Sequence, residues 1–171
     1  MVIASLRART DRYRLREQIA RTDADADPVA IARALGTQEF PWGITQALSF
    51  ALFRTYAVPS IGDLLYRTGQ FTGETQKRYD DKVLLLDAPI EYGFEHPTGR
   101  AAIRRINQMH AMYDISNDDM LYVLATFVVC PVQWVNAYEW RRLSDHEITG
   151  LTNHYRPVSY THLTLPTTPY V

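Results

Sequence analysis

Apolar positions along this chain recur with the spacing of amphipathic helices, and turn signals separate the periodic segments. No segment alternates cleanly between apolar and polar residues over more than a few positions, so we expect no sheet. The pattern predicts an all-α fold, a single helical bundle of about six to seven helices. Its first helix is expected over residues 10–22, and the second opens with Asp27 as cap and Pro28 in the first turn and ends at Gly36.

Prolines divide the next predicted helices. Residues 39–69 form one amphipathic helix that we expect to break at Pro59, because a proline cannot donate a helical hydrogen bond. A further helix covers residues 75–93, and Pro89 should kink it near its end. Another helical segment follows over residues 96–114.

Polar caps predict the starts of the last two helices. Ser116 or Asn117 can cap a long apolar helix, whose first turn carries two aspartates that suit the positive end of its dipole. Ser144 is followed three residues later by Glu147, which is the spacing of a capping box. This pair predicts a final helix over residues 144–156.

The longest nearly uncharged stretch, residues 120–138, contains Pro131, Gln133 and Asn136. A stretch interrupted in this way is expected to be a buried helix rather than a membrane span. The apolar segment at the N-terminus is too short for a signal peptide. We therefore expect a protein that is cytoplasmic or peripheral to a membrane, with no membrane-spanning segment in this sequence.

Composition excludes several classes of function. The 18 basic and 19 acidic residues give a net charge of −1, which argues against nucleic acid as a partner, because such binding depends on an excess of Lys and Arg. A length of 171 residues, 46% of them hydrophobic, suffices for one domain with a real core. Cys130 is the only cysteine, so neither an intrachain disulfide nor a Cys-rich metal site can form. It is most simply a small core residue.

The last segment, residues 157–171, differs from the rest in being uncharged and rich in proline and threonine. The codons of residues 157–167 can spell the end of a transposase-based sequencing adapter. We therefore expect residues 157–171 to be a translated adapter rather than native protein. The functional domain is then expected over residues 10–156, truncated at its C-terminus; a genuine Thr/Pro-rich tail is the alternative.

One histidine lies on the apolar face of the helix predicted over residues 96–114. The residues on this face are Ala102, Ile103, Ile106, Met109, His110 and Tyr113. Asn107 flanks it, while Arg104 and Arg105 lie off it. One imidazole nitrogen of His110 could bind a metal while a neighbouring acceptor holds the other. On the pattern alone, a hydrogen-bonded core histidine is favoured by roughly four to one.

Other motifs give weaker signals. His146 and His154 lie among polar residues of the last helix, which favours a solvated face. No serine has the glycine-flanked elbow of a hydrolase. Arg78 and Lys82 lie one turn apart beside two aspartates, so a salt-bridged surface is the simpler interpretation. The alternative is that Arg78 faces into the bundle, where its planar fork could meet a carboxylate ligand or a heme propionate.

Four sequence blocks carry a family resemblance, and the match as a whole covers about residues 13–147. They are EFPW..TQALSFALFRTYAVPSI, TG.F....QKRYDD, GRAAIRRINQMH and DISNDDMLYVLATFVVCPVQW. In this order and at these spacings they resemble the mpaB/rubber oxygenase family of heme-dependent oxygenases. The resemblance implies a mostly helical domain that holds heme b through a histidine. It also implies that dioxygen is used to cleave a double bond of an isoprenoid.

The resemblance assigns roles to individual residues. His110 matches the axial histidine that ligates the heme iron, and Arg78 matches an arginine that rubber-cleaving members keep ahead of that histidine. Asn107 and Asp114 occupy positions where those members carry arginines, so the surroundings of the heme differ here. Lys82 stands where many members have threonine, so the resemblance does not predict what Lys82 contacts.

These observations together predict a heme b-dependent oxygenase. The predicted iron ligand is His110, and the other predicted cofactor-binding residues are Arg78, Arg104, Arg105 and Asn107, with Arg78 also the candidate catalytic residue. The partners of this oxygenase would be dioxygen and a hydrophobic, isoprenoid-like small molecule. The alternative is a non-enzymatic helical module that binds a lipid or a protein, in which His110 is a core residue.

Overall fold

The computed structural model describes residues 13–69 and 73–163, and these ranges contain helices and no strand, which confirms the all-α fold. A helical segment over residues 13–21 comes first. The elements that follow are α2 (Pro28–Ala34), the π-helical turn η1 (Leu35–Glu39), α3 (Pro41–Thr55), α4 (Pro59–Arg67), α6 (Thr75–Tyr92), α7 (Pro97–His110), α8 (Asn117–Tyr138) and α9 (Asp145–Leu163).

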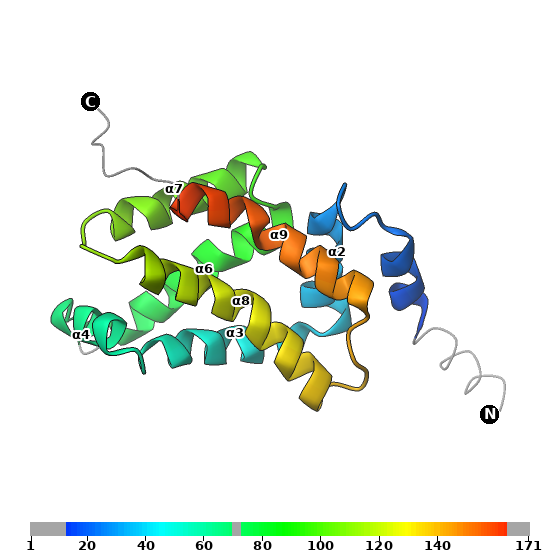
Figure 1. The fold of residues 1–171 in the computed structure, drawn as a ribbon, viewed down its shortest axis with the longest axis horizontal. Coiled ribbons are helices and arrows are strands. Elements are labelled where there is room, and N and C mark those ends of the chain that lie inside the picture. The colour runs from blue at the N-terminus through cyan, green and yellow to red at the C-terminus, as the bar shows by residue number, and fades with distance from the viewer. Residues whose placement is uncertain (1–12, 70–72, 164–171) are drawn as a thin grey trace.

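The helices pack as two pairs that are joined through α9 and α2. Helix α3 lies along α8, and α6 lies along α7. Helix α9 packs on both α2 and α8, while α2 also contacts α6 (Figure 1). The principal contacts of α7 are therefore with α6, its neighbour in sequence.

The hydrophobic core lies at one end of the bundle, where α2, η1 and the start of α3 meet the end of α8 and α9. Its fully buried side chains include Ile31, Leu35, Phe40 and Val135. At the other end, on the left of Figure 1, α4 buries no residue. Large apolar side chains also remain exposed on outer faces, among them Trp42, Phe53, Tyr66, Leu84, Met112 and Tyr138. The C-terminal end of α7 lies at this more open end.

Local capping chemistry confirms several predicted helix starts. The Asp27 carboxylate accepts a hydrogen bond from the amide three residues on, at 3.0 Å. Ser116 Oγ accepts one from the amide of Asp119 at 3.1 Å. In the capping box, Glu147 Oε2 accepts from the amide of Ser144 at 2.8 Å, and Ser144 Oγ accepts from the amide of Glu147 at 3.3 Å. These side chains satisfy amides that the first helical turn leaves without partners.

One predicted helix end is wrong, and one predicted break is confirmed. Gly36 does not stop the second helix, because the backbone continues through η1, where the amide of Phe40 donates to Leu35 O at 2.9 Å. The core contact of Phe40, only 1% exposed, stabilises this five-residue turn. The break predicted at Pro59 is confirmed, since α3 ends at Thr55 and Pro59 is the first residue of α4.

Helix α8 differs from the fully buried helix that its sequence predicts. Only 22% of its most apolar window is buried, because α3 and α9 cover part of its surface and the rest faces outward. Among the described residues, it is the single helix long and apolar enough to cross a membrane by length and composition. Helix α9 extends past Pro157 to Leu163, and residues 164–171 lie outside the described part of the chain.

We expect Gly99→Ala to lower the free energy of unfolding by about 1–3 kcal/mol, because the new methyl group has no space. Gly99 is buried in the first turn of α7, and a Cβ there would overlap the carbonyl oxygen of Gly93. Gly93 has φ 84°, and this restricted backbone conformation limits how far its carbonyl can move away from the new methyl group. Urea denaturation followed by circular dichroism measures the change. Gly73→Ala is the control, since a Cβ at Gly73 meets nothing within 4 Å; equal midpoints for the two variants would contradict the prediction.

Candidate functional site

His110 is the last residue of α7, and its side chain is half-buried. Three apolar residues of the predicted face, at positions 103, 106 and 109, are half-buried as well, and Ala102 is buried. Tyr113 lies beyond the end of the helix and is 42% exposed. The helical period therefore predicted the face correctly up to His110, where the helix ends. A histidine in this last turn also suits the negative end of the helix dipole.

Asn107 lies one turn before His110 and has a buried polar atom. Its side-chain oxygen has no hydrogen-bond partner among the described residues. A buried acceptor without a donor costs about 1–3 kcal/mol, so a water molecule, an ion or a ligand at this atom would offset the cost. The final turns of α7 thus present an imidazole and an unsatisfied amide oxygen side by side.

The arginines of α7 and the two cationic residues at positions 78 and 82 of α6 divide into three groups. Arg104 and Arg105 are exposed on α7. Arg100 is exposed as well and forms an ion pair with Glu95. Arg78 belongs to α6, but its side chain lies outside the described part of the structure, as does that of Lys82. The structure therefore brings His110, Asn107 and two arginines together on one helix and leaves the contribution of Arg78 untested.

The donor set on α7 fits a heme in its chemistry: an imidazole on a half-buried apolar face, with guanidinium groups for the propionates. Two pockets open into the described part of the bundle, and His110 lines neither of them. The larger has a volume of ≈180 Å³, below the roughly 300 Å³ at which cavities for drug-sized ligands begin. A heme held by His110 would therefore occupy the open side of α7 and not these cavities.

His154 is a buried histidine that the sequence pattern did not predict as a candidate site residue. The expected solvated face is wrong here, because His154 is 1% exposed and its ring packs on Phe94 and Tyr155, with centroids 4.8 and 5.0 Å apart. Burial lowers the pKa of His154 to about 4, so the imidazole is neutral at pH 7. His146 is half-buried, and its Nε2 lies 2.8 Å from Thr22 O. The buried face of α9 contains Glu147, Leu151 and His154. Because two of these three residues are polar, the hydropathy pattern did not predict that this face is buried.

A second missed cluster is a buried ionic triad. Arg141 Nε lies 2.7 Å from Glu39 Oε1, and its Nη2 lies 2.7 Å from Glu147 Oε1. The guanidinium also stacks over the ring of Phe40, 4.9 Å from its centroid. Burial raises the pKa of Glu147, but hydrogen bonds from Arg141 and Ser144 oppose this and leave the pKa below its usual value. The triad ties η1 and the start of α9 to the connection after α8, so its role is structural.

Comparison with curated proteins gives the family. A protein of Penicillium roqueforti (strain FM164) named ER-bound oxygenase mpaB is 40% identical over 141 residues, or 77% of this chain. Two proteins of Penicillium brevicompactum, named ER-bound oxygenase mpaB and ER-bound oxygenase mpaB', are each 38% identical over 136 residues. The chain belongs to the mpaB family.

This mpaB-family chain is shorter than the relatives it matches. It spans 46% of the length of the first relative and 34% and 31% of the other two. No protein-family profile and no solved structure matches the chain. The family membership expected from the four sequence blocks is confirmed, whereas heme binding and rubber oxygenase activity remain predictions.

Proposed function

We propose that this mpaB-family chain is the heme-binding part of an oxygenase that uses dioxygen to cleave or oxygenate a hydrophobic, isoprenoid-like substrate. The supporting observation is its 40% identity to an ER-bound oxygenase, in a chain that carries His110 on a half-buried apolar face. Heme iron binds and activates dioxygen, which the side chains of this protein cannot do alone.

The residues of α7 divide the task of holding the cofactor. His110 would supply the imidazole that binds the iron, and the half-buried apolar residues before it on α7 would contact the apolar ring of the heme. Arg104 and Arg105, exposed on the same helix, would pair with the propionates, and Arg78 of α6 would add a further guanidinium. Asn107 offers a buried acceptor beside the imidazole. It can fix the orientation of a bound group that donates a hydrogen bond.

An apolar substrate also suits a protein associated with a membrane. The names of the relatives place them at the endoplasmic reticulum, and α8 leaves most of its apolar window unburied. Isoprenoid chains partition into lipid because their transfer from water is favourable. Membrane association would therefore place the protein where its substrate concentrates.

We expect His110→Ala to weaken heme binding by about tenfold or more, because the imidazole that would bind the iron is lost. Purified protein is mixed with hemin, and the Soret band is followed by titration. His96→Asn is a matched control, since His96 is an exposed histidine at the N-cap of the same helix and asparagine preserves that cap. Its heme affinity should equal that of the unaltered protein.

Two results would overturn the proposed function. One is the absence of a Soret band from the unaltered protein, and the other is full heme affinity in His110→Ala. If His110→Ala changed only the urea midpoint, His110 would be a core residue. The alternative, a non-enzymatic helical module that binds a lipid or a protein, would then be favoured.

A further inference from the structure

Aromatic side chains of α3 and α8 form a connected patch on the outside of the bundle. The ring of Trp134 on α8 contacts Trp42 and Phe50 of α3, with centroids 6.3 and 5.0 Å apart. Trp134 also contacts Tyr138, at 4.7 Å. Trp42 and Tyr138 are 65% and 71% exposed, and Phe53, one turn after Phe50, is 69% exposed. We call these five residues the aromatic patch.

The exposed side of α8 continues this apolar surface along the bundle. Its positions recur every four residues, so they lie on one side of the helix: Leu121, Ala125, Val129, Gln133 and Ala137. Beyond the two aspartates of its first turn, α8 carries no charged residue. The single charged residue of α3 is Arg54. The outer surface of this helix pair is therefore large, apolar and almost free of charge.

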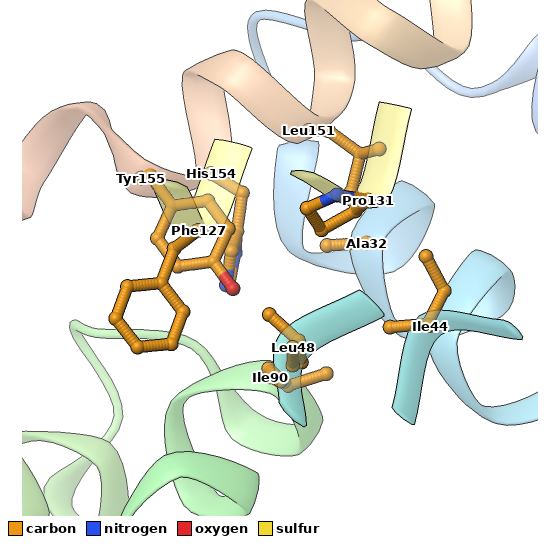
Figure 2. Close-up of a pocket in the computed structure, with 9 residues that line it drawn as sticks. All are labelled: Ala32, Ile44, Leu48, Ile90, Phe127, Pro131, Leu151, His154 and Tyr155. Carbon is orange, nitrogen blue, oxygen red and sulfur yellow. The ribbon is translucent and has the colours of Figure 1, made fainter. Parts of the chain in front are cut away.

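The pockets lie elsewhere on the two helices. Ile44 and Leu48 of α3 and Pro131 of α8 line the smaller pocket together with residues of α9 (Figure 2). None of the aromatic patch lines that pocket or the larger one. Protein partners usually anchor side chains in pockets and use charged groups to fix their register. A surface that offers neither suits a fluid, apolar partner better.

We propose that the aromatic patch and the exposed side of α8 bind the surface of a zwitterionic lipid bilayer, with both helices lying in the interface. Tryptophan and tyrosine concentrate at this level of a bilayer, because their rings are apolar and their N–H and O–H groups are polar. An almost uncharged surface is complementary to headgroups of zero net charge, whereas recognition of anionic lipids depends on clusters of Lys and Arg. The inference rests on the membrane association within the proposed function and names the surface responsible.

Flotation of the unaltered chain with phosphatidylcholine vesicles measures its partition coefficient. We expect the chain to float with these vesicles equally at about 0.1 M and about 0.5 M salt, because salt screens charges and not apolar contacts. Adding phosphatidylserine to the vesicles should change the partition coefficient by about fivefold or less, which is the effect of one cation near an anionic surface.

Phe53→Ser tests the aromatic patch and should lower the partition coefficient about tenfold, because one large apolar side chain is no longer transferred from water. Leu84→Ser is the matched control and should leave the coefficient nearly unchanged. Leu84 is equally exposed, at 70%, but it belongs to α6, outside the proposed surface. Circular dichroism of both variants shows whether their helices are retained.

Tryptophan fluorescence gives a readout that does not depend on a loss of binding. Phosphatidylcholine with brominated acyl chains should quench Trp42, whereas Trp140, which contacts Phe40 of the core, should keep its emission. Trp42→Phe keeps an apolar ring in the patch. This variant should therefore still float with the vesicles but show less quenching.

Four results would overturn the proposal. They are no flotation with phosphatidylcholine, equal losses in Phe53→Ser and Leu84→Ser, quenching that Trp42→Phe leaves unchanged, and a dimer in sedimentation that Phe53→Ser abolishes. In the last case a second copy of the chain would cover the patch. No assay here contains hemin, so failed vesicle binding and failed heme binding are distinguishable.

Discussion

Replacement of Arg141 by alanine is expected to lower the free energy of unfolding by about 3–5 kcal/mol, the range for breaking a buried ion pair from one side. The side chains of Arg141, Glu39 and Glu147 are 9%, 5% and 1% exposed, so water cannot replace the lost guanidinium. Two carboxylates would be left close together and without their cation. Urea denaturation at pH 7, followed by circular dichroism, measures the loss.

The neighbouring Arg142 provides a matched control, because it is exposed and one residue away. Arg142→Ala should change the free energy of unfolding by about 0.5 kcal/mol or less. The effect of Arg141→Ala should also shrink in acid, since protonated carboxyl groups no longer require a cation. A loss below about 1 kcal/mol at pH 7 would show that the triad adds little.

Acid is expected to destabilise the fold through His154 by up to about 3 kcal/mol, from about 1.4 kcal/mol for each unit of pKa. The pKa of His154 is about 4 in the folded protein and 6.5 in the unfolded chain. Between these values the unfolded chain binds the extra proton. The free energy of unfolding therefore falls as the pH is lowered from above 6.5 toward 4.

The measurement is a series of urea denaturation curves between pH 7 and pH 4.5 for the unaltered chain and for His154→Phe. Because phenylalanine cannot take up a proton, the variant should lose less stability across this range. His96→Asn should keep the full acid sensitivity. An identical pH dependence in the unaltered chain and His154→Phe would exclude His154 as the cause.

Helix starts were predictable because their causes are local. Asp27, Ser116 and Ser144 cap amides only three residues away, so a short stretch of sequence contains both partners. The continuation of the chain past Gly36 was not predictable in this way. It depends on Phe40 reaching a core that residues more than a hundred positions later help to form.

The candidate site likewise combines features that the local sequence predicts with features that depend on distant segments. The period of α7 placed His110 and Asn107 near one face, which needs only helical geometry. Which elements lie opposite that face depends on packing between distant segments, and no periodicity encodes it. The partnership of Arg141 with Glu39 spans 102 residues. His154 was hidden because a buried polar residue looks, in sequence, like an exposed one.

The packing of α7 mainly on α6 has a consequence for how the protein opens. The pair α6 and α7 contacts the other helices chiefly through α2, so fewer tertiary contacts hold it in place than hold the core around α9. Such a pair behaves as a cooperative unit that unfolds locally at a lower free energy than the whole domain. A ligand bound to His110 would stabilise the folded state of this helix pair. Cofactor binding and the folding of α6 and α7 would therefore be one coupled equilibrium.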